Sequence, residues 1–314
     1  MAGRVLDNWR LIAANLLFGA NFSFFVSLTH HAIDFRTLFI LQVLCGAICF
    51  IPHALVSPNS YHLTWRDALR IVAVSGLVIY GWMYLLLWGS SYTHPIDAAV
   101  IASLGPAITL LADRLLNHGE HFNRSRVVGI VASFIGAWLL IFDKGFSLIG
   151  GSRGWGNLLV FGAIVAIATN TVIIKPQLER LGARAVMGWL YLIGLIITLP
   201  LYGHRIDLQA LGQLPLGIRL ELLYILLPGT VWPMWLLYRG AEQLTAVHTA
   251  LYRYIQPLSA GIVAHIRHQA TFDATNITAL LFILVGVILT VVGYRRSIEV
   301  ISGLRVPRRP RQRR

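Results

Sequence analysis

The chain has 314 residues, of which 56% are hydrophobic and only 12% are charged, and its formal net charge is +13. Soluble domains carry about 25% charged residues, so this composition excludes an ordinary soluble protein and indicates lipid as the main surroundings. The positive charge does not indicate nucleic-acid binding, because most Lys and Arg stand at the ends of apolar runs and no folded nucleic-acid-binding module accompanies them.

Apolar runs long enough to cross a membrane recur along the chain. A spanning helix needs about 20 mostly apolar residues. The predicted spans, in chain order, are residues 10–29, 35–55, 68–90, 96–115, 125–142, 155–175, 184–203, 219–239, 246–266 and 275–294. Only short connections separate them, so the sequence predicts an all-α integral membrane protein with ten transmembrane helices.

The distribution of Lys and Arg predicts how the chain is oriented. Placing both termini in the cytoplasm puts 19 of the 26 Lys and Arg on that face and six on the other, with Arg253 inside a span. Cytoplasmic loops carry the excess of positive charge in membrane proteins. The segment after Tyr294 holds eight of the 26, and we interpret it as a basic cytoplasmic tail near anionic lipid rather than a nucleic-acid-binding segment.

The two parts of the chain resemble each other in sequence. Leu86–Pro106 aligns with Leu237–Pro257 at a constant offset of 151 residues. The matched residues are Gly89 with Gly240, Ala99 with Ala250 and Pro106 with Pro257, and after a one-residue shift Phe122 with Phe272 and Gly136 with Gly286. Five helices in each part give the two parts opposite topology, a plan that recurs in secondary transporters whose substrate binds between the repeats. The predicted organisation is a first repeat (1–148), a second repeat (149–296) and a basic cytoplasmic tail (297–314).

Polar and aromatic side chains recur inside corresponding spans of the two repeats. Asn21 in the first span and Asn170 in the sixth form one pair. Hydrogen bonds between helices are the usual role of such residues, and substrate contact is the alternative. Aromatic residues, among them Trp82 and Trp232, are abundant on the third and eighth spans, which also correspond. They are candidates for an aromatic cavity wall, with packing or lipid contact as the alternative.

A single Arg interrupts the ninth span. Arg253 lies seven residues after Ala246, which is about 10 Å along a helix. A charge at the centre of a bilayer costs about 2.5–3.5 kcal/mol on insertion scales. Two interpretations remain open. Arg253 either reaches the interface or pairs with Glu242 or helix carbonyl groups, or it faces a wet cavity and binds an anionic group such as a carboxylate.

Further polar residues share one face of the ninth span, since they recur at spacings of four, four and three: His248, Tyr252, Gln256 and Ser259. A polar stripe within a membrane should face protein or water. His248 is the only plausible titrating group near the stripe, and no span has a central acid, so the sequence does not indicate proton coupling. Pro257 and its counterpart Pro106 are expected to kink their helices, as packing features or as openings onto a cavity.

Three stretches carry a resemblance to a known family. They are LLFGANFSF in the first span, the segment GSSYTHPIDAAVIASLGPAITLLADRLLNHGEHFNRSRVVGIVASFIGAWLL, and LLPGTVWPMWLLYRGAEQLTAVHTALYRYIQP. Over residues 10–294 the chain resembles the ten-helix EamA-type transporters of the drug/metabolite transporter superfamily. The resemblance implies a bacterial inner-membrane carrier for a small metabolite, with a central cavity lined by both repeats. One departure is His268-Gln269-Ala270, where a second Gly-Glu pair like Gly119-Glu120 is common.

These observations predict a secondary-type carrier that moves a small metabolite, amino-acid-like or another small organic compound, by alternating access, with export as the expected direction. The expected partners are the substrate and the lipid bilayer, and no cofactor or metal is expected. One alternative is a flippase for lipids or lipid head groups. Another is a membrane-embedded lipid-modifying enzyme, which we do not favour because the sequence has no phosphate loop, zinc-ligand spacing or nucleophile elbow.

Overall fold

The computed structural model describes residues 2–61, 63–117, 124–142, 152–242, 244–269, 274–275, 277–286 and 288–289. All regular elements in these ranges are helices, so the predicted all-α class is confirmed. The predicted basic tail, 297–314, and the pair Gly119-Glu120 lie outside the described residues.

The elements of the first part of the chain are α1 (Ala2–His31), α2 (Phe35–Leu55), η1 (Pro58–Tyr61), α3 (Trp65–Ser75), η2 (Gly76–Tyr84), α4 (Leu85–Ser90), α5 (Pro95–Ala102), α6 (Gly105–Asn117) and α7 (Arg124–Phe142). Polar side chains define where two of these helices begin. Asp34 accepts a hydrogen bond from the Arg36 backbone N–H at the start of α2, and Thr64 and Asp67 cap each other at the start of α3.

The second part contains α8 (Arg153–Ile173), α9 (Lys175–Tyr202), η3 (Gly203–Arg205), α10 (Leu208–Gln213), α11 (Leu216–Leu226), η4 (Leu227–Val231), α12 (Trp232–Ala241), α13 (Ala246–Leu251), η5 (Tyr252–Tyr254) and α14 (Ile255–Ile266). Ser152 caps α8, and Thr245 caps α13. Gly182 inside α9 has φ 78°, a conformation that favours glycine, so the helix restarts after it.

Seven helices within the described residues are long and apolar enough to cross a membrane. They are Trp9–His30, Phe35–Leu55, Trp65–Ser90, Pro95–Asn117, Arg153–Ile173, Lys175–Arg205 and Leu216–Ala241. Shorter apolar helices, Val127–Gly136 and Ile277–Gly286, fall within the fifth and tenth predicted spans. The ninth predicted span is divided among α13, η5 and α14. Ten spans therefore stay a prediction.

In four of the predicted spans the regular α-helix is interrupted part-way along its length. The third and eighth contain π-type segments, η2 and η4, and such segments frequently occur at functional sites. The fourth breaks between α5 and α6, and Pro106 is the second residue of α6. The ninth passes through the 3₁₀ turn η5 just before Pro257. Each proline thus lies in the first turn of a new helix, where its missing N–H needs no partner.

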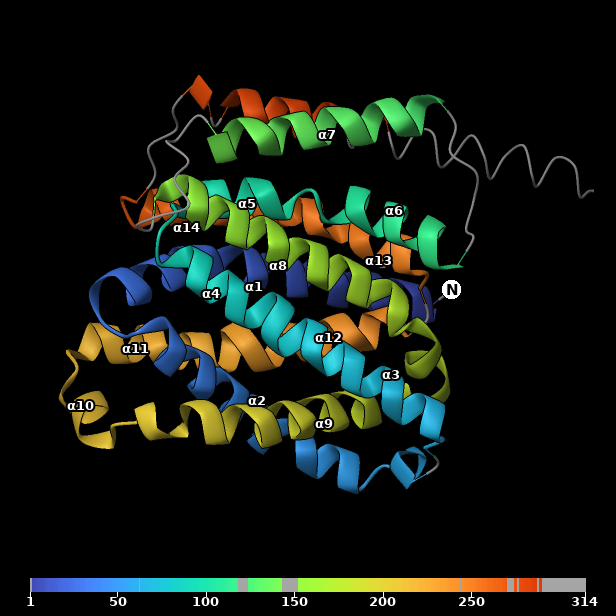
Figure 1. Cartoon of the computed structure of the whole chain (residues 1–314), viewed down its shortest axis with the longest axis vertical. Coiled ribbons are helices and arrows are strands. Elements are labelled where there is room, and N and C mark those ends of the chain that lie inside the picture. The colour runs from blue at the N-terminus through green and yellow to red at the C-terminus, as the bar shows by residue number, and fades with distance from the viewer. Residues whose placement is uncertain are drawn as a thin grey trace, which may run out of the picture.

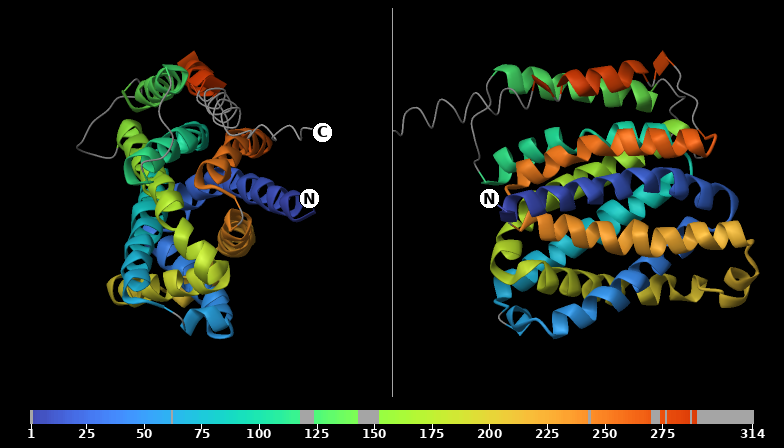
Figure 2. Two further views of the ribbon diagram at one scale, coloured as in Figure 1. Left: turned by 90° about the vertical axis from the view of Figure 1, so that its right-hand side faces the viewer. Right: turned by 180° about the vertical axis from the view of Figure 1, so that it is seen from behind.

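The bundle is held together by contacts between distant segments. The α2 helix packs along α9, α1 packs against α12 and α14, and α8 packs against α6, η2 and α4. Figure 1 shows the helices running side by side, with α7 at one edge of the bundle and α2 with α9 at the other. The further views in Figure 2 show α7 paired with residues 277–286 at that first edge. Gly136 of α7 approaches the Ala279 carbonyl there.

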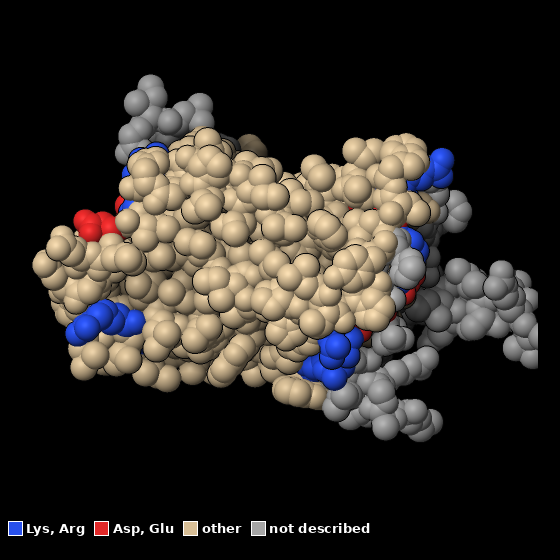
Figure 3. Space-filling view, turned by 90° about the horizontal axis from the view of Figure 1, so that it is seen from below, with Lys and Arg blue, Asp and Glu red and all other residues tan. Residues whose placement is uncertain are grey.

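The surface of the bundle matches a membrane environment. Figure 3 shows Lys, Arg, Asp and Glu gathered at the two ends of the molecule, with a broad belt of other residues between them. Large apolar side chains are exposed on this bundle, among them Ile48, Ile197, Leu220 and Ile262. An apolar belt between two charged rims indicates a helical protein that spans a bilayer.

Candidate functional site

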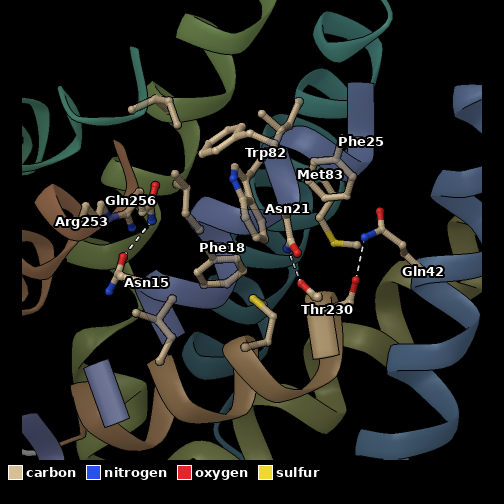
Figure 4. A pocket seen from close by; sticks show the side chains of 17 residues that line it. Asn15, Phe18, Asn21, Phe25, Gln42, Trp82, Met83, Thr230, Arg253 and Gln256 are labelled. Atoms are coloured by element: carbon tan, nitrogen blue, oxygen red, sulfur yellow. Dashed lines mark hydrogen bonds between the residues drawn. The ribbon is translucent and has the colours of Figure 1, made fainter. Parts of the chain in front are cut away.

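A cavity lies at the centre of the bundle. It is bounded by α1, α2, η2, α4, α8, η4, α12, η5 and α14, so both parts of the chain contribute to its wall (Figure 4). The apolar wall includes Phe18, Phe22, Phe25, Trp82, Met83 and Ile164. The polar groups on the wall are Asn15, Asn21, Gln42, Thr230, Arg253 and Gln256.

The cavity is narrow in this conformation. The volume that the centres of water molecules can occupy is about 30 Å³. One water needs roughly 10–15 Å³ on this measure, so the space holds about two waters. Binding of any larger molecule requires the walls to separate.

One end of the cavity is formed by hydrogen bonds to the π segment η4. Asn21 donates its Nδ2 to the Gly229 carbonyl (2.5 Å), and Gln42 donates its Nε2 to the Thr230 hydroxyl (2.6 Å), as Figure 4 shows. The Thr230 hydroxyl in turn donates to the Ile225 carbonyl at 2.7 Å. The Asn21 Oδ1 atom is buried and has no hydrogen-bond partner among the described residues. This end therefore offers one free acceptor.

The other end of the cavity contains Arg253 and Gln256. Gln256 donates its Nε2 to Asn15 Oδ1 at 2.7 Å, which joins α14 to α1. Arg253 is only 5% exposed, and its Nη2 donates to the Thr171 hydroxyl at 3.0 Å. Thr171 donates to the Ile167 carbonyl at 2.7 Å, which fixes the hydroxyl as the acceptor for Arg253.

Arg253 has no acidic partner among the described residues. Its Nε atom is buried without a hydrogen bond, and no carboxylate lines the described wall of the cavity. The expected alternative partner, Glu242, instead binds Arg239 at 2.7 Å and accepts from the Ala183 backbone N–H. The buried side chain also does not extend to the surface. Of the two interpretations of Arg253, the geometry favours the cavity.

The structure brings together four of the eight substrate-binding candidates: Arg253, Gln256, Asn21 and Trp82. Trp82 meets Phe18 edge-to-face, with ring centroids 5.4 Å apart. The other four lie elsewhere. Trp232 is 57% exposed, His248 is exposed in the first turn of α13, and Tyr252 is half-buried away from the wall.

Asn170, the fourth, lines a second hollow. Its Nδ2 donates to the Tyr238 hydroxyl at 3.3 Å, and its Oδ1 has no partner among the described residues. This hollow shares Ile167 and Leu237 with the central cavity. Asn170 therefore lines a neighbouring hollow rather than the wall of the central cavity.

A third hollow adjoins the second one. The second hollow shares Lys175 and Ala246 with an outer hollow, where water centres can occupy about 330 Å³. Charged groups surround this outer space, including Asp113, Arg114 and Glu179. The charged outer hollow, the hollow beside Asn170 and the central cavity are thus neighbours that share wall residues.

The opposite end of α8 is closed by a buried ion pair. Both Asp97 carboxylate oxygens accept from Arg153, at 2.6 Å and 2.8 Å, and Asp97 is fully buried. Asn157 donates to the same carboxylate at 3.2 Å and accepts from the Thr93 hydroxyl. This network joins α5 to α8.

Thr230 and Met83 are wall residues that the sequence analysis did not select. Thr230 belongs to the Leu227–Val231 segment, and Met83 follows Trp82 in η2. The sequence does carry a signal near Thr230. The Pro228-Gly229 pair lies inside an apolar run, and such a pair indicates an interruption of the regular helix. Nothing in the sequence marks Met83, because an apolar residue in a span faces lipid, protein or cavity with the same pattern.

Fold and site together define a polytopic α-helical membrane protein with a polar-ended central cavity. Comparison with known proteins gives the family: the EamA-like transporter family matches residues 9–142 and 154–292. The chain belongs to the EamA-like transporter family, and it is a multi-pass membrane transporter.

Relatives of the chain agree with this assignment. It is 23% identical over 235 residues to "Uncharacterized transporter YetK" of Bacillus subtilis (strain 168), covering 73% of this chain and 70% of that protein. It is 21% identical over 244 residues to "Uncharacterized transporter YyaM" of the same organism, covering 77% and 76%. A solved crystal structure superposes with a TM-score of 0.65 at 15% identity, covering 94% of this chain and 98% of the other, which shows a shared fold.

Proposed function

We propose that this chain is a secondary carrier that moves a small organic metabolite across the membrane by alternating access. The proposed direction of transport is export. The observation that carries the proposal is the central cavity, whose wall comes from both parts of the chain. In alternating access two repeats rock around a fixed central site, so a cavity shared by both is the expected place for the substrate.

Two inverted five-helix repeats, residues 1–148 and 149–296, are supported by where the helices are interrupted. The π segments begin at Gly76 and Leu227, which are 151 residues apart, the same offset that aligns the two parts of the sequence. Pro106 and Pro257, which follow the breaks in the fourth and ninth predicted spans, share this offset. Helices that break at matched places provide backbone groups for a site at the repeat interface.

The packing of the helices supports the same organisation. The α1 helix contacts α12 and α14, whereas α8, its counterpart in the second repeat, contacts η2, α4 and α6. Exchanging the two repeats converts the first set of contacts into the second. The α2 and α9 helices correspond to each other and pack together. Such a pattern is expected for two repeats related by a two-fold axis.

The two ends of the cavity favour a conformation that opens to one side. The hollow beside Asn170 adjoins a hollow of about 330 Å³, whereas the Asp97–Arg153 ion pair joins the helices at the other end of α8. Alternating access requires this asymmetry to reverse during the cycle.

We further propose that both termini lie in the cytoplasm of a bacterial cell, with the chain in the inner membrane. The excess of Lys and Arg on that face supports this orientation. The orientation places the outer hollow, which Lys175 lines, on the cytoplasmic side. The test is labelling of intact cells with a membrane-impermeant maleimide, in a Cys45→Ser/Cys49→Ser background. Gln209→Cys should react from outside and Asn117→Cys only after lysis, since both positions are exposed. The reverse pattern would refute the orientation.

A membrane-embedded enzyme receives no comparable support. It needs acids or histidines clustered around a substrate. Among the described residues, no three His, Cys, Asp or Glu side chains lie close enough together to hold a metal ion.

Transport is tested with the purified full chain in liposomes. A pool of labelled amino acids and small organic acids is presented, with protein-free liposomes as the control. Uptake that depends on protein and is accelerated by unlabelled substrate inside the vesicles supports a carrier. If no solute moves while a fluorescent lipid changes leaflet only when protein is present, the flippase alternative replaces the carrier proposal.

A further inference from the structure

We propose that the central cavity takes an organic monoanion, with its carboxylate on Arg253 and an apolar body against Phe18 and Trp82, and that it has no requirement for an amino group on the ligand. The inference deepens the proposed carrier function and rests on it, but it concerns binding and has its own test. The class covers aromatic and branched aliphatic monocarboxylates.

The first support is the uncompensated charge. Arg253 is 95% buried, donates to one neutral hydroxyl, and has an unpartnered Nε. Burial of a charge is unfavourable unless an opposite charge and hydrogen bonds accompany it. Because no acidic side chain of the described wall supplies that charge, a bound anion is the group that completes the site.

The second support is that the guanidinium is held in place. Thr171 accepts from Nη2, and the aliphatic stem of Arg253 runs over Gly105 at the start of α6. A Cβ atom added at Gly105 would lie 2.7 Å from Arg253 Cδ, so the stem passes close to this glycine and would have to shift if a larger residue stood there. An Arg fixed at its stem and at one nitrogen presents the rest of its planar fork to a carboxylate.

The third support is the composition of the remaining wall, which determines how polar the rest of the ligand is. Aromatic and aliphatic side chains, including Phe22, Phe25 and Leu86, form most of the surface between the two polar ends. The far end provides Asn21 Oδ1, a neutral acceptor that suits one hydroxyl or N–H group. With one cationic group and no anionic group on the described wall, a single negative charge is matched, whereas an ammonium finds no countercharge.

The test measures binding of four probes that share one body: 3-phenylpropanoate, phenylalanine, 3-phenylpropanamide and 3-phenylpropylamine. Binding to the purified full chain in detergent is measured by calorimetry at pH 7.5. Size-exclusion profiles verify the fold of each variant. Direct binding is used because the protonated acid crosses lipid without a carrier. The expected order places 3-phenylpropanoate first, with the amide weaker by about 30-fold or more, since it lacks the charge that pairs with a buried Arg.

Variants then assign the effect to Arg253. Arg253→Gln should reduce propanoate binding to the level of the amide, and Arg253→Lys should fall between, because it keeps the charge without the planar fork. Arg219→Gln is the matched control: Arg219 is exposed in α11, and its removal changes the net charge equally. This control should bind all four probes as the wild type does.

Each contrary outcome overturns the proposal. Equal binding of the acid and the amide excludes charge recognition. Tighter binding of phenylalanine than of the acid shows a site for the ammonium. Undiminished acid binding by a folded Arg253→Gln variant places the anion elsewhere, and no binding of any probe to the folded wild type removes this ligand class. Failure of the carrier proposal differs: 3-phenylpropanoate then binds through Arg253, but no solute crosses liposomes in a protein-dependent manner.

Discussion

Arg153, at one end of the bundle, and Arg253, in the central cavity, differ in their burial and in their partners, since the Arg153 side chain is 24% exposed and Arg253 only 5%. Arg153 binds both oxygens of Asp97, and Asn157 completes the carboxylate. Arg253 has one hydroxyl partner and a free Nε. A charged group whose hydrogen bonds and countercharge are already supplied gains little free energy from binding another molecule. A buried charge that has no countercharge gains much more when an anion binds. The comparison separates a structural charge from one available to a ligand.

We expect the largest loss of stability at the Asp97–Arg153 ion pair. Arg153→Gln leaves the fully buried Asp97 without its countercharge, and removal of one partner of a buried pair costs about 3–5 kcal/mol. Thermal and denaturant unfolding in detergent should show this loss. The double variant Asp97→Asn/Arg153→Gln should recover most of it, because both charges are gone. If Arg153→Gln were as stable as the wild type, the Asp97–Arg153 ion pair would make no net contribution to stability.

A smaller effect is expected from the backbone contact beside that pair. A Cβ added at Gly156 of α8 would lie 2.8 Å from the Gly89 carbonyl oxygen and 3.0 Å from the Thr93 backbone nitrogen. These backbone atoms cannot move unless α4 and α8 separate, so Gly156→Ala should cost about 1–3 kcal/mol.

Gly162→Ala on the same helix is the control for this prediction. The nearest atom to its added Cβ is Leu85 Cδ1 at 3.5 Å, an ordinary contact. Because alanine favours helix over glycine by up to about 1 kcal/mol, this variant should match or exceed the wild type in stability. Equal losses in the two variants would indicate that close helix approach at Gly156 is unimportant.

A still smaller effect is expected between α1 and α14 at the edge of the cavity. Asn15 and Gln256 share a buried hydrogen bond of 2.7 Å. Coupling energies of such pairs within membranes average about 0.6 kcal/mol. A double-mutant cycle with Asn15→Ala and Gln256→Ala should return a value near this average. Coupling of several kcal/mol would show that the polar wall holds the bundle together, which would weaken its assignment to ligand binding.

The smallest loss of stability is expected at Arg253. Arg253→Met removes a buried charge that has no carboxylate partner among the described residues, so the free energy of unfolding should not fall and a gain is consistent with the geometry. Unfolding of this variant beside Arg153→Gln sharpens the contrast. A loss of about 3 kcal/mol would show that Arg253 is a structural residue like Arg153.

Hydropathy was enough to predict the helical class and most of the spans. A chain within lipid must satisfy its backbone internally, so long apolar runs become helices almost regardless of their detailed sequence. Asn21 and Gln256, which the sequence offered as candidates for substrate binding, line the cavity, because polar groups in a span turn towards protein or water. Their role in binding stays a prediction.

Two of the candidates that lie off the cavity wall stand where the helical period changes. Trp232 directly follows the π segment η4, which winds more slowly than an α-helix. Tyr252 begins the 3₁₀ turn η5, which winds faster and separates it from the face of Gln256. A sequence pattern alone does not reveal where such changes in winding occur.

The narrow cavity has a consequence for the membrane itself. The two inner hollows offer water centres about 30 Å³ and 20 Å³, where each water needs roughly 10–15 Å³. They hold a few separate waters, and an ion crossing them would shed most of its hydration beside a fixed positive charge. A cell stores about 2.3 kcal/mol for each elementary charge per 100 mV of membrane potential. In this conformation we therefore expect the protein to conduct ions poorly, which would preserve the stored potential between transport events.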